Sequence, residues 1–517
     1  MRGRRFETMA EGLTPTLQIS GQSLTLEQIH QVGAGSLHVT LSDSARDRIL
    51  ASRAVVDKLI REKTTVYGVN TGFGKLADVH IDEGELEQLQ INLVRSHSVG
   101  VGNPLAEEET RALMLLRANV LATGYSGCRP VLVETLLGML TRGVSPRIPE
   151  KGSVGASGDL APLAHLALGM IGEGQSLYKG GWIPSREALS AAGIEPVRLA
   201  AKEGLALLNG TQAMGAVGAL ALLRAERVVK LADLAGAISL EALLGTPVAF
   251  DSRIQAVRPH RGQRASAAHL LELLEGSALR ASHLYNDPRI QDAYSLRCMP
   301  QVHGAVRMAL THARETVEIE SGSATDNPLV FADTREILSG GNFHGAPLGY
   351  VYDYAAIALT DLMSMTERRI DRLVNPDLNA GLPPFLSAHP GVSSGYMMTQ
   401  VSAAALLNEA RVLAHPASVD SVPTSGGKED HVSMGMTAAV KLRQIAGLAE
   451  SVLAIELMNA TEGLDYRRPL RSSARIERAH EIVRSVVPRL VHDRSLSEDI
   501  EELTKRVRQG LLDEFLD

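Results

Sequence analysis

Several long stretches of the chain place apolar residues three and four positions apart, which is the spacing of an α-helix with a buried face. The stretch over 347–373 is the clearest, and it stops at Asn375-Pro376, a dipeptide that ends helices. The same spacing predicts long helices over 104–124, 212–244, 397–415 and 436–458. Charges are scattered thinly over 212–244, so we expect this helix to be buried on much of its circumference and to begin a central bundle.

Shorter elements flank these helices. Ser42 is placed to cap a helix that carries Ile49, Val55 and Val56, and residues 176–200 have the pattern of an excursion that contains a hairpin. A cap near residue 495 precedes an amphipathic closing helix. The chain therefore reads as helices joined by short connections.

The composition supports a mainly α-helical protein. Hydrophobic residues make up 44% of the 517 residues but aromatic ones only 3%, so Ala, Leu, Val and Met must fill the core. Close-packed helices suit those side chains better than sheets do.

Charge and cysteine content restrict the class of protein. The net charge of −7 provides no basic surface, which argues against a nucleic-acid partner. Two cysteines, Cys128 and Cys298, are too few for a disulfide framework and agree with a reducing compartment. The basic residues at the start are followed by no apolar segment typical of a secretory signal, and no apolar run is long enough to span a membrane. We therefore expect a cytoplasmic protein.

One stretch, residues 152–160, has neither helical nor strand periodicity. It reads Gly-Ser-Val-Gly-Ala-Ser-Gly-Asp-Leu, and its glycines allow positive φ values and close approach of other atoms. If Ala156-Ser157-Gly158 bend tightly, the Gly158 nitrogen can attack the Ala156 carbonyl carbon and close a five-membered ring. Loss of water from the ring and of the Ser157 hydroxyl as a second water leaves a methylidene group conjugated to a carbonyl, which is a strong electrophile.

Other interpretations of this stretch are less suitable. A cluster of Gly, Ser and Ala alone is usually a flexible turn. A serine-hydrolase elbow needs glycine two residues on each side of the serine, and Asp159 occupies the second of those places. A phosphate-binding loop would continue with Gly-Lys-Ser or Gly-Lys-Thr, which is missing here.

Further polar residues in loops are candidates for chemistry. Tyr67 precedes a loop with three glycines in seven residues, and as a base it would need a neighbour that lowers its high pKa. The guanidinium of Arg297 offers two parallel hydrogen bonds to the carboxylate of an amino acid. Asn209 interrupts an apolar run, and a buried amide must find partners.

The sequence resembles the histidine and phenylalanine ammonia-lyase family over roughly residues 25–505. The strings that carry the resemblance are 152–165 (GSVGASGDLAPLAH), 67–74 (YGVNTGFG), 291–301 (QDAYSLRCMPQ) and 340–345 (GGNFHG). The resemblance implies a mainly α fold of the ammonia-lyase or aspartase-like type. It also implies a 4-methylidene-imidazol-5-one (MIO) prosthetic group formed autocatalytically from Ala156, Ser157 and Gly158.

The resemblance assigns roles to further residues. Asp159 would assist formation of the group, and Tyr67, on a lid, would remove the substrate β-proton. Arg297 would bind the substrate carboxylate. Contacts to the substrate or the prosthetic group are implied for Asn209, Gln291, Tyr294 and Phe343.

Two positions point to an imidazole substrate. Ser96-His97 resembles the histidine-specific members, and His97 can hydrogen-bond a ring nitrogen that a phenyl ring lacks. Glu429 lies in Lys-Glu-Asp-His-Val-Ser-Met, where the histidine-type members usually carry Gln-Glu-Asp-His-Val-Ser-Met, so Lys428 departs from the pattern. The implied reaction is the conversion of L-histidine to trans-urocanate and ammonia, and whether Tyr67 or Glu429 is the base stays open.

The expected organisation has three parts: a poorly ordered extension over 1–20, an N-terminal part over 21–210 with the lid tyrosine and the prosthetic-group loop, and a bundle with C-terminal helices over 211–517. The resemblance implies a homotetramer with active sites shared between chains. No metal is expected, because the His and Cys spacing matches no metal motif. The alternatives are an aromatic amino acid lyase for tyrosine or phenylalanine, an aminomutase, and a non-catalytic helical scaffold.

Overall fold

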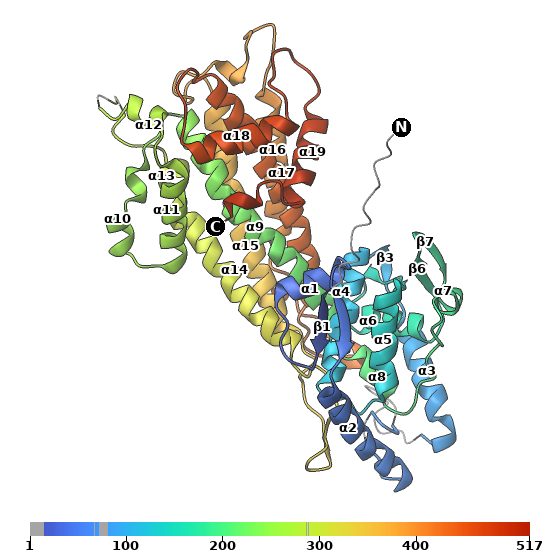
Figure 1. Ribbon diagram of the computed structural model, residues 1–517. Helices are drawn as coiled ribbons and strands as arrows, with labels where there is room; N and C mark the ends of the chain where they lie inside the picture. The colour runs from blue at the N-terminus through green and yellow to red at the C-terminus, as the bar shows by residue number, and fades with distance from the viewer. Residues whose placement is uncertain (1–14, 67, 72–80, 286, 288, 517) are drawn as a thin grey trace, which may run out of the picture. The chain divides into compact units, whose positions relative to one another are not determined.

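The computed structural model describes residues 15–66, 68–71, 81–285, 287 and 289–516. Over these residues the protein is mainly α-helical, with four small sheets of two or three strands (Figure 1). The helical fold expected from the periodicity is therefore confirmed.

The chain divides into two compact units. Unit 1 consists of Met1–Ala219, Val317–Gly345 and Ser421–Met436, and unit 2 of Leu220–Thr316, Ala346–Asp420 and Thr437–Asp517. The division falls inside three long helices, α9 (Gln212–Ala242), α14 (Met299–Ser321) and α17 (Gly435–Asp465).

Unit 1 begins with a strand. Thr16–Ile19 lie within the poorly ordered extension predicted over 1–20, but they form β1 because their backbone pairs in parallel with β2 (His38–Leu41). Ser42 caps the following helix as expected, since its hydroxyl accepts a hydrogen bond from the Ala45 N–H at 3.2 Å. The helices of this unit are α1 (Leu26–Gly33), α2 (Asp43–Arg61), α3 (Leu86–His97), α4 (Glu107–Ala122), α5 (Pro130–Arg142), α6 (Leu160–Met170), α7 (Ser185–Ala191) and α8 (Glu203–Leu208).

The small sheets of unit 1 hold its loops in place. The strand β5 (Pro149–Lys151) pairs antiparallel with β3 (Val101–Pro104) and leads directly into the loop that precedes α6. The predicted hairpin is present as β6 (Gln175–Tyr178) and β7 (Gly181–Pro184), to which β4 (Ser145–Pro146) is added. A second hairpin joins β8 (Leu329–Phe331) to β9 (Glu336–Leu338).

Long helices dominate unit 2. The predicted helices over 347–373 and 397–415 are present as α15 (Ala346–Val374) and α16 (Met397–Leu413), and these two helices pack against each other. In Figure 1 the segments of α9, α14, α15 and α17 that belong to this unit run alongside one another. The remaining helices are α10 (Ser252–Ala256), α11 (Arg261–Leu274), α12 (Ala278–Ser282), α13 (Tyr294–Arg297), α18 (Ala474–Val486) and α19 (Ser497–Arg508).

Buried polar groups tie the helices of unit 2 together. Arg369 on α15 donates from Nε to Oε1 of Glu456 on α17 at 2.5 Å, and both side chains are fully buried. The helix predicted to end near Met458 continues to Asp465 because its later polar residues find partners on neighbouring elements. Asn459 donates to Thr399 Oγ1 at 2.9 Å, and Glu462 accepts from Arg484 at 2.6 Å.

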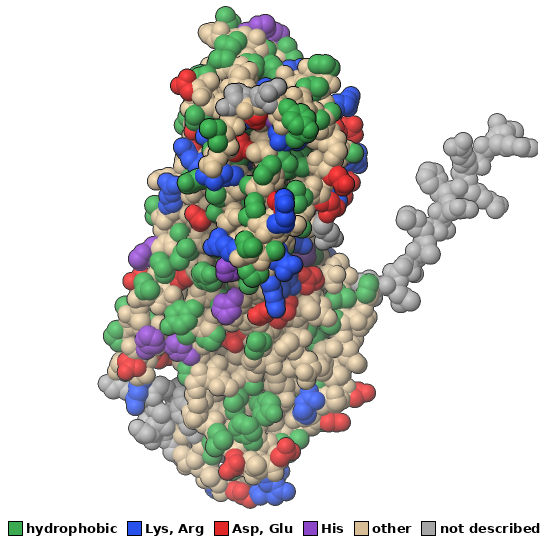
Figure 2. Space-filling model, turned by 90° about the vertical axis from the view of Figure 1, so that its left-hand side faces the viewer, with side chains coloured by type: hydrophobic (Ala, Val, Ile, Leu, Met, Phe, Trp, Pro, Cys, Tyr) green, Lys and Arg blue, Asp and Glu red, His purple; other side chains and the backbone are tan. Residues whose placement is uncertain are grey.

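Short 3-10 helices complete the described chain. They span Glu83–Glu85, Pro247–Phe250, Pro384–Leu386, Ala417–Val419, Ser425–Gly427 and Asp513–Phe515. On the face drawn in Figure 2, acidic and basic side chains are interspersed. Among the described helices, none combines the length and the apolar character that crossing a bilayer requires.

Candidate active site

The glycine-rich loop over 152–159 lies between β5 and α6, and its tripeptide is largely buried. Ala156 is only 4% exposed, and Ser157 is half-buried. Gly155 and Gly158 have φ values of +67° and +74°, a region that favours glycine. The loop therefore bends as the sequence predicts.

Gly158 rests directly on the backbone of Gly210, in the turn that follows α8. A Cβ atom at position 158 would lie 2.1 Å from the Gly210 carbonyl oxygen, so only glycine fits this position. The N–H of Asp159 donates to the same oxygen at 2.7 Å. The turn after α8 is thus in direct backbone contact with the tripeptide.

The carboxyl group of Asp159 is fully buried beside this contact. Its oxygens accept hydrogen bonds from the Ser153 hydroxyl and from the Met214 N–H, both at 2.7 Å. Burial raises the pKa of Asp159 to about 6, although these hydrogen bonds lower it in part. A carboxyl group with this pKa can hold or release a proton near neutral pH, as a group that assists dehydration would need to do.

Glu429 reaches the tripeptide from a distant part of the sequence. Its Oε1 accepts a hydrogen bond from the Ser157 hydroxyl at 2.7 Å. Its Oε2 accepts from the Thr424 hydroxyl at 2.7 Å, and the Thr424 N–H donates to the Glu429 carbonyl oxygen at 2.8 Å. Thr424 therefore holds one carboxylate oxygen, which leaves the other directed at Ser157.

The sequence did not single out Thr424. The signal for it is the Ser425-Gly426-Gly427 turn that follows, because this turn lets the chain reverse and pair Thr424 with Glu429. All three residues of the turn have positive φ values, between +51° and +82°.

Two more contacts fasten the segment after Glu429 onto the glycine-rich loop. The Ser433 hydroxyl donates to the Gly155 carbonyl oxygen at 2.9 Å, and the Met434 N–H donates to the Val154 carbonyl oxygen at 2.8 Å. The Gly345 N–H also donates to the Gly155 oxygen, at 3.3 Å. Three separate segments of unit 1 therefore meet at the tripeptide.

The neighbours of Gly345 and Glu429 bring aromatic rings to this region. Phe343 is half-buried two residues before Gly345. The imidazole rings of His344 and His431 are stacked, with centroids 5.7 Å apart and planes 5° from parallel. His344 Nε2 also donates to the His431 carbonyl oxygen at 3.3 Å. These contacts connect the 340–345 turn with the Glu429 segment.

Asn209 ends α8 immediately before the turn that supports Gly158. Its side chain is 4% exposed, and its Oδ1 atom has no hydrogen-bond partner among the described residues. A buried amide oxygen without a partner is costly, so this atom is suited to receive a group that the described contacts do not supply. The residue after Asn209, Gly210, contacts Gly158, so this acceptor suits a prosthetic group formed from the tripeptide.

His97 is the last residue of α3 and is half-exposed. Its Nδ1 donates to the Leu93 carbonyl oxygen at 2.9 Å. With the proton on Nδ1, the neutral ring keeps Nε2 as an acceptor for an N–H donor.

The remaining predicted residues either belong to unit 2 or lie outside the described residues. Gln291, Tyr294 and Arg297 belong to unit 2, where the Arg297 guanidinium lies 4.5 Å from the centroid of the Tyr294 ring. Gln291 and Tyr294 are exposed, and Arg297 Nε is buried without a described partner. Tyr67 lies outside the described residues.

Comparison with known proteins places these features in context. Residues 24–485 match the family model described as aromatic amino acid lyase. A curated histidine ammonia-lyase from Stigmatella aurantiaca is 56% identical over 96% of this chain and 97% of its own length. Among solved structures, the histidine ammonia-lyase of Trypanosoma cruzi is 43% identical with a TM-score of 0.90, covering 97% of this chain and 95% of that one. The tyrosine aminomutase of Streptomyces globisporus is 38% identical with a TM-score of 0.91, covering 97% and 98%.

Proposed function

Because the chain belongs to the aromatic amino acid lyase family, we propose that it deaminates L-histidine to trans-urocanate and ammonia. The observation that carries this proposal is the hydrogen bond from the Ser157 hydroxyl to Glu429 Oε1 at 2.7 Å. It joins the residue that must lose its hydroxyl to a carboxylate that can hold an imidazole. The relatives named as histidine ammonia-lyases support the same substrate.

The residues of unit 1 suit the self-modification of the tripeptide. Gly158 leaves room for close approach, and Asp159 provides a carboxyl group whose pKa lies near neutrality. When formed, MIO supplies an electrophile that takes up the substrate amine and makes nitrogen a better leaving group. Asn209 Oδ1, a buried acceptor without a partner among the described residues, belongs to the residue that precedes Gly210.

The substrate ring is proposed to lie between two acceptors. Glu429 Oε1 and His97 Nε2 are both acceptors, so together they suit a protonated imidazole ring, which has an N–H on each nitrogen. A phenyl ring offers a donor to neither of them, and a phenol ring to at most one. A site built for a hydrogen bond rejects an analogue that lacks it by about 5 to 7 kcal/mol. Arg297 would hold the substrate carboxylate with its two parallel donors. Tyr67 and Glu429 are the two candidates for the base that takes the β-proton.

We further propose a homotetramer in the cytoplasm, with sites shared between copies. Arg297, Tyr294 and Gln291 belong to a different unit from Ser157, so a second copy could provide them. Exposed apolar side chains at helical spacing on the adjoining helices α15 and α16 are suited to contact another copy; they are Tyr350, Tyr354, Ile357, Met398, Val401 and Val412.

The proposal is tested by incubating the protein with L-histidine, L-tyrosine and L-phenylalanine and following the absorbance of the conjugated acrylate. We expect turnover of histidine and little turnover of the others. Product analysis by mass spectrometry and chiral chromatography separates a lyase from an aminomutase, which would yield a β-amino acid. Comparable turnover of tyrosine would assign the protein to the aromatic substrates instead.

Replacing the serine tests the electrophile itself. Ser157→Ala should lower the rate with histidine by about 10³-fold or more, which corresponds to about 4 kcal/mol in the barrier. It should also abolish the mass deficit of two waters and leave the oligomer intact. Ser190→Ala, an exposed serine on α7, is the matched control and should keep both the rate and the deficit. Full activity in Ser157→Ala would exclude the proposed chemistry.

A further inference from the structure

Arg117 on α4 is fully buried, which is unusual for a guanidinium group. Burial lowers its pKa to about 10, and the negative charge of Asp326 counteracts this only in part. A buried cation must be compensated by hydrogen-bond acceptors, so the groups that accept from it indicate what it holds in place.

The described acceptors of Arg117 lie in α8, in the turn that follows it and at the first residue of α9. Nη1 donates to the Asn209 carbonyl oxygen and, at 2.6 Å, to Gln212 Oε1. Nη2 donates to the Ala206 carbonyl oxygen. The guanidinium therefore satisfies carbonyl groups that the helix end leaves without a partner.

This turn is the one on which the tripeptide rests. Gly210, directly after Asn209, accepts the Asp159 N–H at 2.7 Å, and its carbonyl oxygen lies where a Cβ of residue 158 would be. Gly158 and Gly210 also form an isolated parallel bridge. If the turn moved, the support behind Gly158 would move with it.

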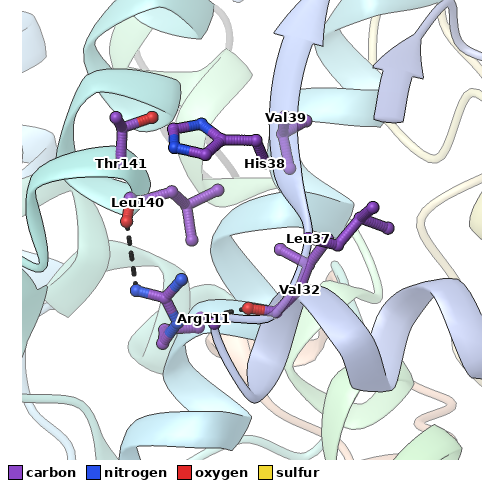
Figure 3. A pocket seen from close by; sticks show the side chains of 8 residues that line it. Val32, Leu37, His38, Val39, Arg111, Leu140 and Thr141 are labelled. Atoms are coloured by element: carbon purple, nitrogen blue, oxygen red, sulfur yellow. Dashed lines mark hydrogen bonds between the residues drawn. The ribbon is translucent and has the colours of Figure 1, made fainter. Parts of the chain in front are cut away.

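A second arginine on the same helix provides a comparison. Arg111 Nε donates to the carbonyl oxygens of Val32 and Gly33 at 3.2 and 3.1 Å, and Nη1 donates to that of Leu140 at 3.1 Å (Figure 3). Burial lowers its pKa as well. Arg111 thus donates hydrogen bonds to carbonyl groups at the ends of α1 and α5. Its described acceptors do not include the turn after α8.

We infer that Arg117 is a positioning residue for the self-modification of residues 156–158, an inference that rests on the proposed function. In that reaction the Gly158 nitrogen bonds to the Ala156 carbonyl carbon. The Ala156 oxygen leaves as water with the amide protons of Gly158 and Ser157. The Ser157 hydroxyl leaves as a second water with the proton of its α-carbon, so no oxidant is consumed. Ring closure needs Gly158 pressed against a fixed support, and Arg117 fixes that support through Asn209 and Ala206.

The test measures the intact mass of purified chains, which reports the modification without any assay of activity. The wild type and Arg111→Met should both show the deficit of two waters. Arg117→Met, similar in length but without donors, should lose the deficit in most chains. Arg117→Lys, with one donor nitrogen, should reach the deficit more slowly in a time course after expression. Thermal unfolding of each variant is recorded alongside.

The outcomes separate the inference from the proposed function. A folded Arg117→Met with the full deficit overturns the inference and leaves the function standing. If Arg117→Met does not fold, Arg117→Lys decides, and a deficit acquired at the wild-type rate overturns the inference. A wild type without the deficit overturns both. If Arg111→Met also loses the mass deficit, then any change that destabilises α4 prevents the modification. That result would also contradict a specific role for Arg117.

Discussion

At the scale of single residues, the tripeptide region shows how burial and hydrogen bonds prepare ordinary side chains for unusual chemistry. Serine is common in turns, but the hydroxyl of Ser157 donates to the Glu429 carboxylate, whose other oxygen accepts from Thr424. Asp159 is fully buried, and the donors described at its carboxyl group are neutral: the Ser153 hydroxyl and the N–H groups of Met214 and Ala213. Its environment therefore favours the protonated form more than water does.

This environment predicts a pH dependence of stability. Burial raises the pKa of Asp159 from 3.8 to about 6, so the folded chain binds this proton more tightly than the unfolded chain does. The resulting stabilisation is complete below the unfolded pKa and is lost as the pH rises through the folded pKa, a change of about 2 kcal/mol between pH 4 and pH 7. The side chain in Asp159→Asn cannot ionise. As the pH rises from 4 to 7, the free energy of unfolding of the chain with Asp159 should therefore fall relative to that of Asp159→Asn.

The comparison is best made in a Ser157→Ala background, where neither chain can cyclise. The Tm of Ser157→Ala and of Ser157→Ala/Asp159→Asn is measured by calorimetry at pH values from 4 to 7. The Asp chain should lose Tm relative to the Asn chain as the pH rises. A Tm difference that does not change with pH would contradict the raised pKa.

At the scale of elements, backbone contact between helices sets which side chains are possible. In unit 2, α11 and α14 meet at two buried glycines. A Cβ at Gly262 would lie 2.1 Å from the Gly304 carbonyl oxygen, and a Cβ at Gly304 would lie 2.3 Å from the Gln263 nitrogen. Backbone atoms cannot move aside as a flexible side chain can, so these helices can only be this close with glycine at both positions.

Gly304→Ala should therefore destabilise the protein by about 1–3 kcal/mol or more, because the helices must separate. Gly138→Ala is the matched control in α5, where the nearest atom to the new Cβ would be Ile194 Cδ1 at 3.9 Å. That change should be neutral or stabilise by up to about 1 kcal/mol, since alanine favours helices over glycine. Thermal unfolding of the two variants checks this, and equal Tm values would contradict the close contact.

At the scale of the whole molecule, the exposed apolar side chains on α15 and α16 predict self-association. Ile357 and Tyr354 are 45% and 50% exposed on a helix whose opposite face is buried. Replacing both with lysine should disrupt contact with another copy through the cost of burying charge. Sedimentation should show a wild-type species of four 55.3 kDa chains and a smaller species for the double variant.

Leu50→Lys, at a leucine that is 49% exposed on α2, is the control for a surface apolar residue outside this face and should keep the wild-type size. If the site is shared between copies, dissociation should also lower the rate with histidine. A double variant that sediments like the wild type would exclude this face as the interface.

Much of the fold was predictable because helical periodicity and caps are local properties. The helices over 212–244 and 347–373 follow from the spacing of Leu, Val and Ala alone, and the cap at Ser42 follows from its position before an apolar pattern. The prediction ended α17 too early because Asn459 and Glu462 look like surface residues in sequence. Their partners Thr399 and Arg484 lie on other helices, and only packing reveals them.

The sequence by itself determined that Ala156-Ser157-Gly158 have the groups needed to close a ring and lose two waters, because that conclusion depends on the residues' own chemistry. The choice of His97 and Glu429 for an imidazole came from the family resemblance and stays a prediction. Only the tertiary structure decided that the Ser157 hydroxyl lies 2.7 Å from Glu429 Oε1 and that Thr424 orients this carboxylate. It also decided that Arg117 binds the turn on which Gly158 packs. These contacts join residues far apart in the chain. No local pattern records such contacts, since they arise only when the core of unit 1 brings its three segments together.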